Sequence, residues 1–577
     1  MRRTLSLALA LAFPVLASAQ ESIRLNQLGF YPDGPKAAVV VGATGDDFAV
    51  VDAASGETVF RGALGAESEW EPSAERVRRA DFSAFATPGT YVLRADGAGT
   101  SYPFEIAEAV IEPVAKGAIK GYYYQRMSTP LLPEHAGKWA RAAGHPDDHV
   151  LIHPSAASDT RPAGTVIAAS KGWYDAGDFN KYIVNSGITM GTLLSAYEDF
   201  PGKAAALDLN IPESGNDVPD LLDEILWNLR WMLAMQDPAD GGVYAKLTAP
   251  QFEGMIMPAE AKSPRYVVQK STPAALDFAA VTAQAARVFR GFEDTYPGLA
   301  DSCLTASIAA WQWARRNPEV MYNQRAMNEQ FDPDVTTGAY GDRRVTDEFA
   351  WAAAELYVTT EADSFLHAVD LFPDRRMILP GWPVVGTLAY YTLLRHADRL
   401  PPAVAPHVLE ARARVLAYAD SLVAAGRASA YGVTMNAPRD FVWGGTAVLA
   451  NQGIVLVNAY LQSPRPEYLH YAIANMDYLV GRNATGYSFV TGFGDKPTMN
   501  PHHRQSEADG IVDPVPGLLS GGPNPGQQDG CDYPSKLPAL SYVDATCSYA
   551  SNEIAINWNA PLAYLSVAIE ALMGDSE

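Results

Sequence analysis

The spacing of apolar and polar residues divides the chain into two parts. Between residue 22 and about residue 107, short runs of β-forming residues alternate with turn signals such as Pro32-Asp33-Gly34 and Pro88-Gly89. These runs predict strands at Ile23–Asn26, Ala37–Val41, Phe48–Val51, Thr58–Arg61, Thr90–Leu93 and Tyr102–Ile106. Several short strands within roughly 85 residues are typical of a small immunoglobulin-like β-sandwich, which we expect over residues 20–107.

From about residue 113 the apolar period becomes helical. Leu221, Ile225, Leu229 and Met232, for example, share one face of a helix. The expected helices are Pro113–Met127, Ile188–Asp199, Asp220–Met235, Ala274–Phe289, Cys303–Arg315, Asp347–Val358, Val384–His396, His407–Ala424, Thr446–Leu461, Tyr468–Val480 and Pro561–Leu572. So many helices, joined by long loops, predict a large, mainly α domain over residues 108–577. Helices paired around a closed ring would gather these loops at one end, where a cleft can form.

Composition and charge narrow the class of partner. The chain has 577 residues, of which 48% are hydrophobic and 19% charged, and its net charge is -23. Those fractions are typical of a folded globular protein. Neutralising phosphates requires clustered Lys and Arg, so we expect no nucleic-acid partner. An acidic surface suits an uncharged or cationic substrate.

The N-terminus has the features of a secretory signal. Arg2 and Arg3 precede an apolar run from Leu5 to Leu16, and Ala17-Ser18-Ala19 matches an A-x-A cleavage site. We therefore expect a signal peptide over residues 1–19 and a secreted or periplasmic protein. The apolar run is too short to span a bilayer, and we expect no later membrane segment.

The three cysteines leave at least one thiol unpaired within a monomer. Cys531 and Cys547 lie close in sequence and export permits oxidation, so a disulfide between them is one possibility. Two buried free thiols are the other possibility, and Cys303 is left over in either case.

The segment Lys171–Tyr182 carries the most chemical information. Asp175 and Asp178 are separated only by Ala and Gly, so both carboxylates can approach one water molecule. Trp173 and Tyr174 beside them offer flat faces that suit sugar rings. The alternative is a surface turn with two solvated acids, because DAGD alone is an ordinary turn sequence.

Two later segments supply further polar groups. The first ends in His502 and Arg504, and the second contains Asp544 and Glu553. Apolar and aromatic residues surround Glu553, so burial can raise its pKa and let it act as a general acid near neutral pH. Capping of the last helix is the alternative for Glu553, which lies too far upstream for a capping box.

These segments resemble the signatures of glycoside hydrolase family 9, the cellulase family E. Ser488–Arg504 resembles the histidine signature, Tyr542–Ala560 the acidic signature, and Trp173–Asp178 the DAGD block of that family. Asp347–Leu356 resembles a fourth block, and the similarity runs from about residue 22 to the C-terminus. The chain is thus identified as a member of the branch with an N-terminal immunoglobulin-like domain. The resemblance implies an (α/α)6 barrel for the helical domain.

The resemblance also implies roles for single residues. Asp178 would be the catalytic base, Asp175 would help to hold the nucleophilic water, and Glu553 would be the general acid. Asp544 would be a supporting acidic position. Expected substrate contacts, some of them from aromatic side chains for which core packing is the alternative, are His502, Arg504, Trp173, Tyr174, Tyr431, Trp443 and Tyr549.

Metal sites are expected to be structural at most, and the chemistry requires no cofactor. Many relatives carry an early zinc site of Cys and His, but this chain has Met127 and His145 without the cysteines, so we expect that zinc site to be absent. Calcium is common in the family. The acidic positions that could bind it, with solvated acids as the alternative, are Asp223, Glu224, Asp277, Asp342, Asp347 and Glu348.

A base and a separate acid without a nucleophile imply single displacement by water with inversion, for which the carboxyl groups stand about 6.5–9.5 Å apart. A retaining enzyme would need about 5–5.5 Å. We expect a secreted, monomeric endo-β-1,4-glucanase acting on cellulose-type glucans or cello-oligosaccharides. The alternatives are an exo-acting cellodextrinase, β-glucosidase or glucosaminidase of the same family, and a carbohydrate-binding protein that has lost catalysis.

Overall fold

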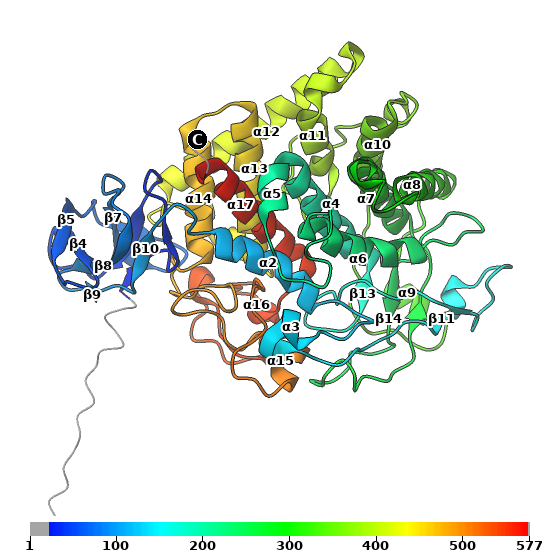
Figure 1. The fold of residues 1–577 in the computed structure, drawn as a ribbon, viewed down its shortest axis with the longest axis horizontal. Helices are drawn as coiled ribbons and strands as arrows, with labels where there is room; N and C mark the ends of the chain where they lie inside the picture. The colour runs from blue at the N-terminus through cyan, green and yellow to red at the C-terminus, as the bar shows by residue number, and fades with distance from the viewer. Residues whose placement is uncertain (1–21, 575–577) are drawn as a thin grey trace, which may run out of the picture.

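The computed structural model describes residues 22–574, and its N-terminal part is a β-sandwich (Figure 1). One sheet has the strand order β1-β3-β7-β6, and the other has β2-β10-β8-β4-β5 with β9 paired to β8. Phe30, Phe82 and Phe104 pack together in its core, with ring centroids 5.1–5.4 Å apart. The strands are β1 Ile23–Arg24, β2 Gly29–Phe30, β3 Ala37–Val41, β4 Asp47–Asp52, β5 Thr58–Ala63, β6 Ser68–Trp70, β7 Glu75–Asp81, β8 Gly89–Ala95, β9 Gly99–Thr100 and β10 Phe104–Ile106.

The longest strand that the sequence pattern misses is β7. Val77 and Ala80 are its buried residues, and charged side chains fill most of the remaining positions. A strand with so few apolar residues does not stand out from a loop, although it pairs with β3 along its length.

The helical domain is the expected (α/α)6 barrel. Its helices α4 (Ile183–Asp199), α7 (Thr272–Phe289), α10 (Thr346–Thr360), α11 (Gly386–Arg395), α13 (Gly445–Gln462) and α17 (Ile556–Met573) are each buried along most of their length. The helices that pack around them are α2 (Glu112–Tyr124), α6 (Asp220–Ala234), α8 (Leu299–Arg316), α12 (Ala405–Ala428) and α14 (Pro466–Leu479). All the predicted helices are present. The last begins at Ile556 rather than Pro561, because this proline is accommodated inside the helix instead of starting it.

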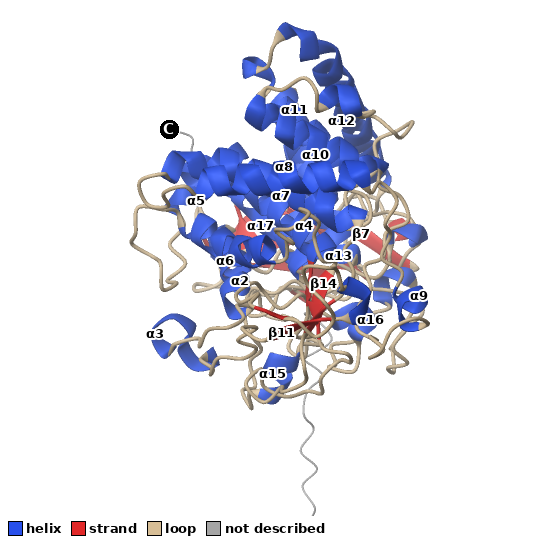
Figure 2. Cartoon of the chain, turned by 90° about the vertical axis from the view of Figure 1, so that its right-hand side faces the viewer, coloured by secondary structure: helices blue, strands red, loops and turns tan. Residues whose placement is uncertain are grey.

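Loops, short helices and a small sheet lie at one end of the barrel (Figure 2). The sheet order is β12-β11-β15-β14-β13. Its strands are β11 Val150–Ile152, β12 Val166–Ile167, β13 Lys181–Tyr182, β14 Lys246–Thr248 and β15 Tyr266–Val267, and the short helices at this end are α3 Pro133–Ala136, α9 Gln324–Asn328, α15 Arg504–Ala508 and α16 Tyr549–Asn552. The short helix α5 Pro201–Ala206 follows the C-terminal end of α4 and lies away from them (Figure 2). Strands of two or three residues carry too few positions for an alternating pattern, so the sequence does not predict this sheet.

The two domains share a polar and aromatic interface. Trp70 of the sandwich packs on Tyr431 of the barrel, with ring centroids 4.2 Å apart. The Tyr431 hydroxyl accepts a hydrogen bond from Arg24 at 2.7 Å and donates one to Glu75 at 2.8 Å. Tyr431 is therefore committed to the domain interface, and the expectation that it contacts substrate is wrong.

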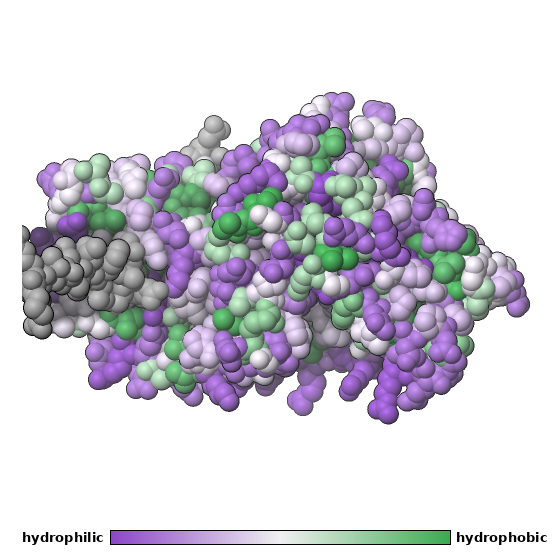
Figure 3. Space-filling model, turned by 90° about the horizontal axis from the view of Figure 1, so that it is seen from below, coloured by the Kyte–Doolittle hydropathy of each residue, from purple (hydrophilic) through white to green (hydrophobic). Residues whose placement is uncertain are grey.

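Of the two alternatives for the cysteines, the structure has the disulfide. Cys531 and Cys547 form a disulfide with a Cα–Cα distance of 5.9 Å, and Cys303 is free and buried. The expected signal peptide over residues 1–19 lies outside the described residues. Within residues 22–574, no helix is long and apolar enough to cross a membrane. The face in Figure 3 is largely hydrophilic, with apolar residues in small separate patches.

Candidate active site

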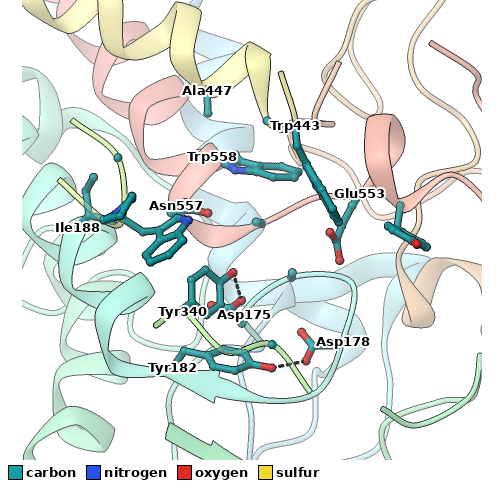
Figure 4. Close-up of a pocket in the computed structure, with 18 of the residues that line it drawn as sticks. Asp175, Asp178, Tyr182, Ile188, Tyr340, Trp443, Ala447, Glu553, Asn557 and Trp558 are labelled. Atoms are coloured by element: carbon teal, nitrogen blue, oxygen red, sulfur yellow. Dashed lines mark hydrogen bonds between the residues drawn. The ribbon is translucent and has the colours of Figure 1, made fainter. Parts of the chain in front are cut away.

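A cavity of about 1040 Å³ lies among the loops at one end of the barrel. Asp175 and Asp178 line it from the loop before β13, and Glu553 lines it from the turn between α16 and α17. Figure 4 shows Glu553 and Asp178 facing the same space from opposite sides. The sequence segments that carry the predicted catalytic carboxyl groups therefore meet at one cavity, although nearly four hundred residues separate them in the chain.

Backbone contacts hold these segments together. The amide of Ile556 donates to the Asp175 carbonyl at 2.8 Å, and the amide of His502 donates to the Asn552 carbonyl at 2.9 Å. Gly177 sits so close to His502 that a Cβ atom on it would lie 2.0 Å from the His502 carbonyl oxygen. The glycine of the DAGD sequence is thus required for close approach of two loops.

Asp178 is 5% exposed and is held by two donors. The Asn180 amide nitrogen donates to its Oδ2 atom at 2.5 Å, and the Tyr182 hydroxyl donates to the same atom at 3.1 Å. Both hydrogen bonds favour the ionised carboxylate and leave its Oδ1 atom for another partner.

Asp175 is more deeply buried and shares its environment with Asp178. The Asn185 amide donates to its Oδ1 atom and the Tyr340 hydroxyl to its Oδ2 atom, both at 2.7 Å. Burial, followed by the negative charge of Asp178, raises the pKa of Asp175 to about 8 against the effect of these hydrogen bonds. Tyr340 has a φ of 44°, a left-handed conformation that is uncommon for a tyrosine.

Glu553 has the environment of a general acid. Burial raises its pKa well above the ordinary value, and the charges of Asp178 and Asp175 raise it further, while Arg504 lowers it. The carboxyl group therefore keeps its proton to a higher pH than an ordinary glutamate does and can donate it into the cavity.

His502 and Arg504 both line the cavity. The His502 Nδ1 atom lies 2.6 Å from the Thr546 carbonyl oxygen, which can only accept, so Nδ1 carries the proton and Nε2 is an acceptor. Burial is the main cause that lowers the His502 pKa, which favours this neutral form. The Arg504 guanidinium donates to the Gly177 carbonyl at 2.7 Å and to the Glu253 carbonyl at 2.8 Å.

Asp544, expected as a supporting acidic position, lies outside the cavity lining. It accepts hydrogen bonds from the amides of Met499 at 2.9 Å and Asn500 at 2.8 Å, and from the Asn552 side chain at 3.1 Å. These contacts hold the residue that precedes Glu553. Asp544 is thus a structural acceptor that fixes the backbone beside the acid.

The expected aromatic contacts divide into two groups. Trp443 and Tyr549 line the cavity with ring centroids 5.5 Å apart, and Trp443 is 42% exposed. Trp173 is buried against Tyr122 and donates to Glu224 at 2.8 Å. Tyr174 is also buried, and its hydroxyl lies 3.0 Å from His145. Neither Trp173 nor Tyr174 lines the cavity, because the loop turns them into the core while the aspartates face out.

Sequence reasoning missed several aromatic residues of the lining. Trp558 lies within the acidic signature, so its position beside Glu553 was available as a signal. Trp382 lies in a loop rich in Gly and Pro, where a tryptophan has no helical or strand pattern to explain it. The aromatic side chains of the lining that were not among the expected substrate contacts are Tyr182, Phe252, Tyr340, Trp382 and Trp558.

The expected calcium positions also separate. Glu224 forms a buried ion pair with Arg126 at 2.9 Å, and Asp223 accepts hydrogen bonds from Tyr296 at 2.6 Å and Asn216 at 3.0 Å. These two carboxylates have protein partners, so the structure gives no reason to assign them to a cation.

Asp277 lies near Asp342, Asp347 and Glu348, and the four form one acidic group. Each of the four has at least one buried carboxylate oxygen without a hydrogen-bond partner. Burial raises the pKa of Asp277 and of Glu348, and the neighbouring acids raise them further. Such oxygens suit calcium chemically. Among residues 22–574, however, no three His, Cys, Asp or Glu side chains are arranged to hold a metal ion.

Apolar residues pack around Met127 and His145, where relatives carry the zinc site that we expect to be absent here. Met127, Tyr174, Phe179 and Ala261 form a small buried cluster, and His145 pairs with Tyr174. Thioether and aromatic groups are poor ligands for zinc, so these residues do not fit a Cys/His zinc site.

Comparison with known proteins gives consistent results. The model of glycosyl hydrolase family 9 matches residues 112–566, and that of the cellulase N-terminal ig-like domain matches residues 18–100. The xyloglucan-specific endo-β-1,4-glucanase of Bacteroides ovatus is 48% identical over 96% of this chain and 94% of its own length. Endoglucanase D of Acetivibrio thermocellus is 34% identical over 94% of this chain and 82% of its own length.

Solved structures agree with the fold. The structure of Bacteroides ovatus GH9 has a TM-score of 0.92 at 46% identity and covers 96% of this chain and 100% of that one. A metagenome-derived glycoside hydrolase family 9 endoglucanase has a TM-score of 0.86 at 33% identity, covering 95% of this chain and 99% of that one. The family models span both domains, and the relatives are similar along nearly the whole chain. The chain therefore belongs to glycoside hydrolase family 9, and it is a glycoside hydrolase with an immunoglobulin-like domain before its catalytic barrel.

Proposed function

We propose that this enzyme cuts internal β-1,4-glucosidic bonds of glucans by single displacement, with Asp178 as the base and Glu553 as the acid. The observation that carries the proposal is the pair of contrasting environments around one cavity. Asp178 accepts two hydrogen bonds that favour its ionised form, while burial raises the pKa of Glu553. A carboxylate held by two donors that faces, across one cavity, a carboxyl group with a raised pKa suits an acid/base hydrolase.

In the proposed reaction, Asp178 removes a proton from a water molecule as the water oxygen attacks the anomeric carbon. Asp175, fixed by Asn185 and Tyr340, orients this water. Glu553 donates its proton to the glycosidic oxygen, so the bond to the leaving sugar breaks as the new bond forms. The product has the inverted anomeric configuration.

Substrate contacts are proposed for residues that line the cavity. The neutral His502 ring presents Nε2 as an acceptor for a sugar hydroxyl, and the Arg504 guanidinium offers donors. Trp443, Tyr549 and Trp558 provide flat faces for glucose rings.

The substrate class is proposed to be a soluble β-1,4-glucan, with xyloglucan favoured over unbranched chains. The relative at 48% identity is named for xyloglucan specificity. A branched backbone also needs room beside the main chain, and small residues of the lining leave such room: Gly338, Ala339, Gly381, Gly444 and Ala447. We further propose that the protein is exported by its N-terminal signal and acts as a monomer.

The test is a product time course on xyloglucan, carboxymethyl cellulose and cellohexaose. Wild type should reduce the viscosity of both polymers early, with a higher kcat/KM on xyloglucan. Asp178→Asn and Glu553→Gln should each lower kcat at least about 100-fold, the usual contribution of a positioned acid or base. Release of only glucose or cellobiose from chain ends would instead support an exo-acting enzyme. Equal activity of wild type and both variants would refute the assignment.

A further inference from the structure

A buried lysine is connected to the proposed catalytic base through neighbouring residues. Lys246 is the first residue of β14, and it is paired with Tyr182 of β13, whose hydroxyl donates to Asp178. The Lys246 side chain is 1% exposed. Its ammonium group lies 5.5 Å from the centre of the Tyr182 ring.

All three ammonium hydrogens of Lys246 have acceptors. They are the Gln324 Oε1 atom at 2.7 Å, the Thr337 Oγ1 atom at 2.9 Å and the Gly338 carbonyl at 2.7 Å. Each acceptor is uncharged, and no salt bridge found in residues 22–574 involves Lys246. Burying a cation without a direct counter-ion lowers the free energy of unfolding. A role in catalysis would explain why a lysine occupies this position.

A chain of hydrogen bonds leads from Lys246 to Asp178. Thr337 accepts from Lys246, and its Oγ1 atom lies 2.6 Å from the Oγ1 atom of Thr248. The single hydroxyl hydrogen of Thr248 has two acceptors, the Asn180 Oδ1 atom at 3.0 Å and the Ala249 carbonyl at 2.7 Å, and the Asn180 amide nitrogen donates to Asp178 at 2.5 Å. With the Thr248 hydrogen on Asn180, every hydrogen in this chain points toward the base, a direction that favours its negative charge.

The orientation of the Asn180 amide is determined by its other neighbours. Its Oδ1 atom also receives the Ala249 amide at 2.9 Å and the Arg265 guanidinium at 3.3 Å. Both groups are donors only, so they must face the oxygen of the side-chain amide. The nitrogen is therefore directed at Asp178, and the chain cannot reverse without losing several hydrogen bonds.

Lys246 also holds the loop that reaches the second aspartate. Its contacts with Thr337 and Gly338 fix the start of the segment that ends in Tyr340, whose hydroxyl donates to Asp175. One cation is thus connected to Asp178 through neutral side chains, and to Asp175 through the backbone segment that carries Tyr340.

We propose that Lys246 is a positioning residue for catalysis, which stabilises the negative charge of Asp178 and orients its carboxylate through Thr337, Thr248 and Asn180. The inference rests on the proposed role of Asp178 as the base. Burial lowers the Lys246 pKa to about 7, while the charge of Asp178 raises it. The ammonium group is therefore charged over the acidic range, in which Glu553 is protonated.

The experiment measures kcat and KM on cellohexaose from acidic to alkaline pH for wild type, Lys246→Met, Thr248→Val and Lys270→Met. Met matches the length of the lysine stem without its charge, and Val matches the shape of threonine without its hydroxyl. Lys270→Met is the control, because Lys270 pairs with Asp237 and Asp240 and does not line the cavity.

Loss of the cation disfavours the ionised form of Asp178, so protonation of the base should stop catalysis at a higher pH. For Lys246→Met we expect kcat to fall about 10-fold or more, KM to stay within about 2-fold, and the acidic limb of kcat/KM to move up by about one pH unit. Thr248→Val should move the limb in the same direction by less, and Lys270→Met should not move it. The groups that face Asp178 and shape this limb are Asp175, Tyr182, Lys246, His502, Arg504 and Glu553.

An unchanged acidic limb in both Lys246→Met and Thr248→Val overturns the inference, even if kcat falls, because a purely structural role lowers the amount of active enzyme without moving the limb. Should Lys246→Met fail to fold, Thr248→Val alone decides by the same criterion. Asp178→Asn separates the two proposals. If that variant stays active, the proposed base is wrong; if it is inactive while Lys246→Met resembles wild type, only the role of Lys246 fails.

Discussion

At the scale of single residues, three carboxyl groups share one cavity and differ in their partners. Asp178 accepts hydrogen bonds from Asn180 and Tyr182, whereas Glu553 has Asp178 and Asp175 as its main charged neighbours. Asp175 keeps its proton to a higher pH than a free aspartate does. These differences suit three separate roles, with Asp178 as the base, Asp175 as the group that orients the water and Glu553 as the acid.

The raised pKa of Glu553 has a consequence for stability. Below the pKa that Glu553 has in the unfolded chain, this residue is protonated in both the folded and the unfolded state. Its pKa difference then has no effect on the free energy of unfolding. As pH rises above the pKa of the unfolded chain, the unfolded chain loses the proton first, so the folded state becomes less stable by up to about 1.4 kcal/mol for each pH unit between the pKa values of the two states. Glu553→Gln removes this penalty, and we expect its Tm to exceed that of wild type by a margin that grows with pH.

Thermal unfolding of wild type and Glu553→Gln at several pH values measures this margin. Glu507→Gln is a suitable control, since this exposed glutamate lies outside the cavity lining. A difference in Tm between wild type and Glu553→Gln that is constant from acidic to alkaline pH would contradict the assigned environment.

The tryptophans give a second residue-scale prediction. Trp443 is 42% exposed in the cavity lining, whereas Trp173 is 1% exposed and packed in the core. Trp443→Ala should raise KM several-fold with little change in stability, as expected for a lost sugar-stacking face. Trp173→Ala should lower the free energy of unfolding by about 3–5 kcal/mol. Kinetics and urea unfolding of the two variants check the contrast, and a reversed pattern would refute it.

Residue-scale prediction from sequence succeeded where a motif carries its own geometry. The DAGD sequence fixes two aspartates near one point, and the structure brings both to the cavity. It failed for Trp173, Tyr174 and Tyr431, because an aromatic residue looks the same in sequence whether it faces a core, an interface or a cleft. Which way a loop residue points depends on contacts between distant segments, such as that of Trp173 with Glu224.

At the scale of elements, the disulfide fastens the loop before the proposed acid. Cys547 follows Thr546, whose carbonyl accepts from His502. Removing both sulfurs in Cys531→Ser/Cys547→Ser should lower the free energy of unfolding by about 3 kcal/mol in the chain-entropy model. KM should rise as well, because His502 loses a firmly placed partner.

Urea unfolding and steady-state kinetics measure both effects. Wild type treated with a reductant should match the double variant, whereas Cys303→Ala should keep the disulfide and the wild-type KM. Equal stability of the double variant and wild type would show that the loop needs no covalent closure.

The acidic group between α7 and α10 gives another element-scale prediction. Asp277, Asp342, Asp347 and Glu348 have buried oxygens without partners, and their mutual repulsion destabilises the fold as pH rises. Calcium is the expectation that the sequence gives for this group, although among residues 22–574 no three of these side chains are arranged to hold a metal ion. Calcium bound here would relieve the repulsion and raise the Tm over that in EDTA, equivalent to about 2.7 kcal/mol when calcium is at 100 times its Kd.

Asp277→Asn and Asp223→Asn give the matched comparison. Without calcium, Asp277→Asn should be more stable than wild type, and it should lose the response to calcium. Asp223→Asn should keep that response, because Asp223 is already paired with Tyr296 and Asn216. A Tm of wild type that is the same in calcium and in EDTA would exclude a calcium site here.

Element-scale prediction from sequence was strong for helices and weak for short strands. Long amphipathic runs such as Asp220–Ala234 repeat their pattern over several turns, so their existence and position are clear. The sheet β11–β15 has no such repetition, although its strand β14 carries Lys246 and Thr248. The support of the base was therefore invisible in sequence, because it arises from the pairing of β13 with β14.

At the scale of the whole molecule, the order of the domains and the barrel followed from the change of period near residue 113 and from the family signatures. The interface between the two domains could not be predicted from either. Trp70 packs against Tyr431 and Phe441, and Phe441 is two residues from Trp443 of the cavity lining. A contact between domains depends on their relative placement, which no local pattern encodes.

In the proposed reaction, water attacks the anomeric carbon directly, with Asp178 and Glu553 in separate roles. The most direct measurement is rapid NMR of the first product released from a β-1,4-linked oligosaccharide such as cellohexaose, before mutarotation. Inversion predicts that the new reducing end appears first in the α configuration. First appearance of the β configuration would show retention through a covalent intermediate and would contradict it.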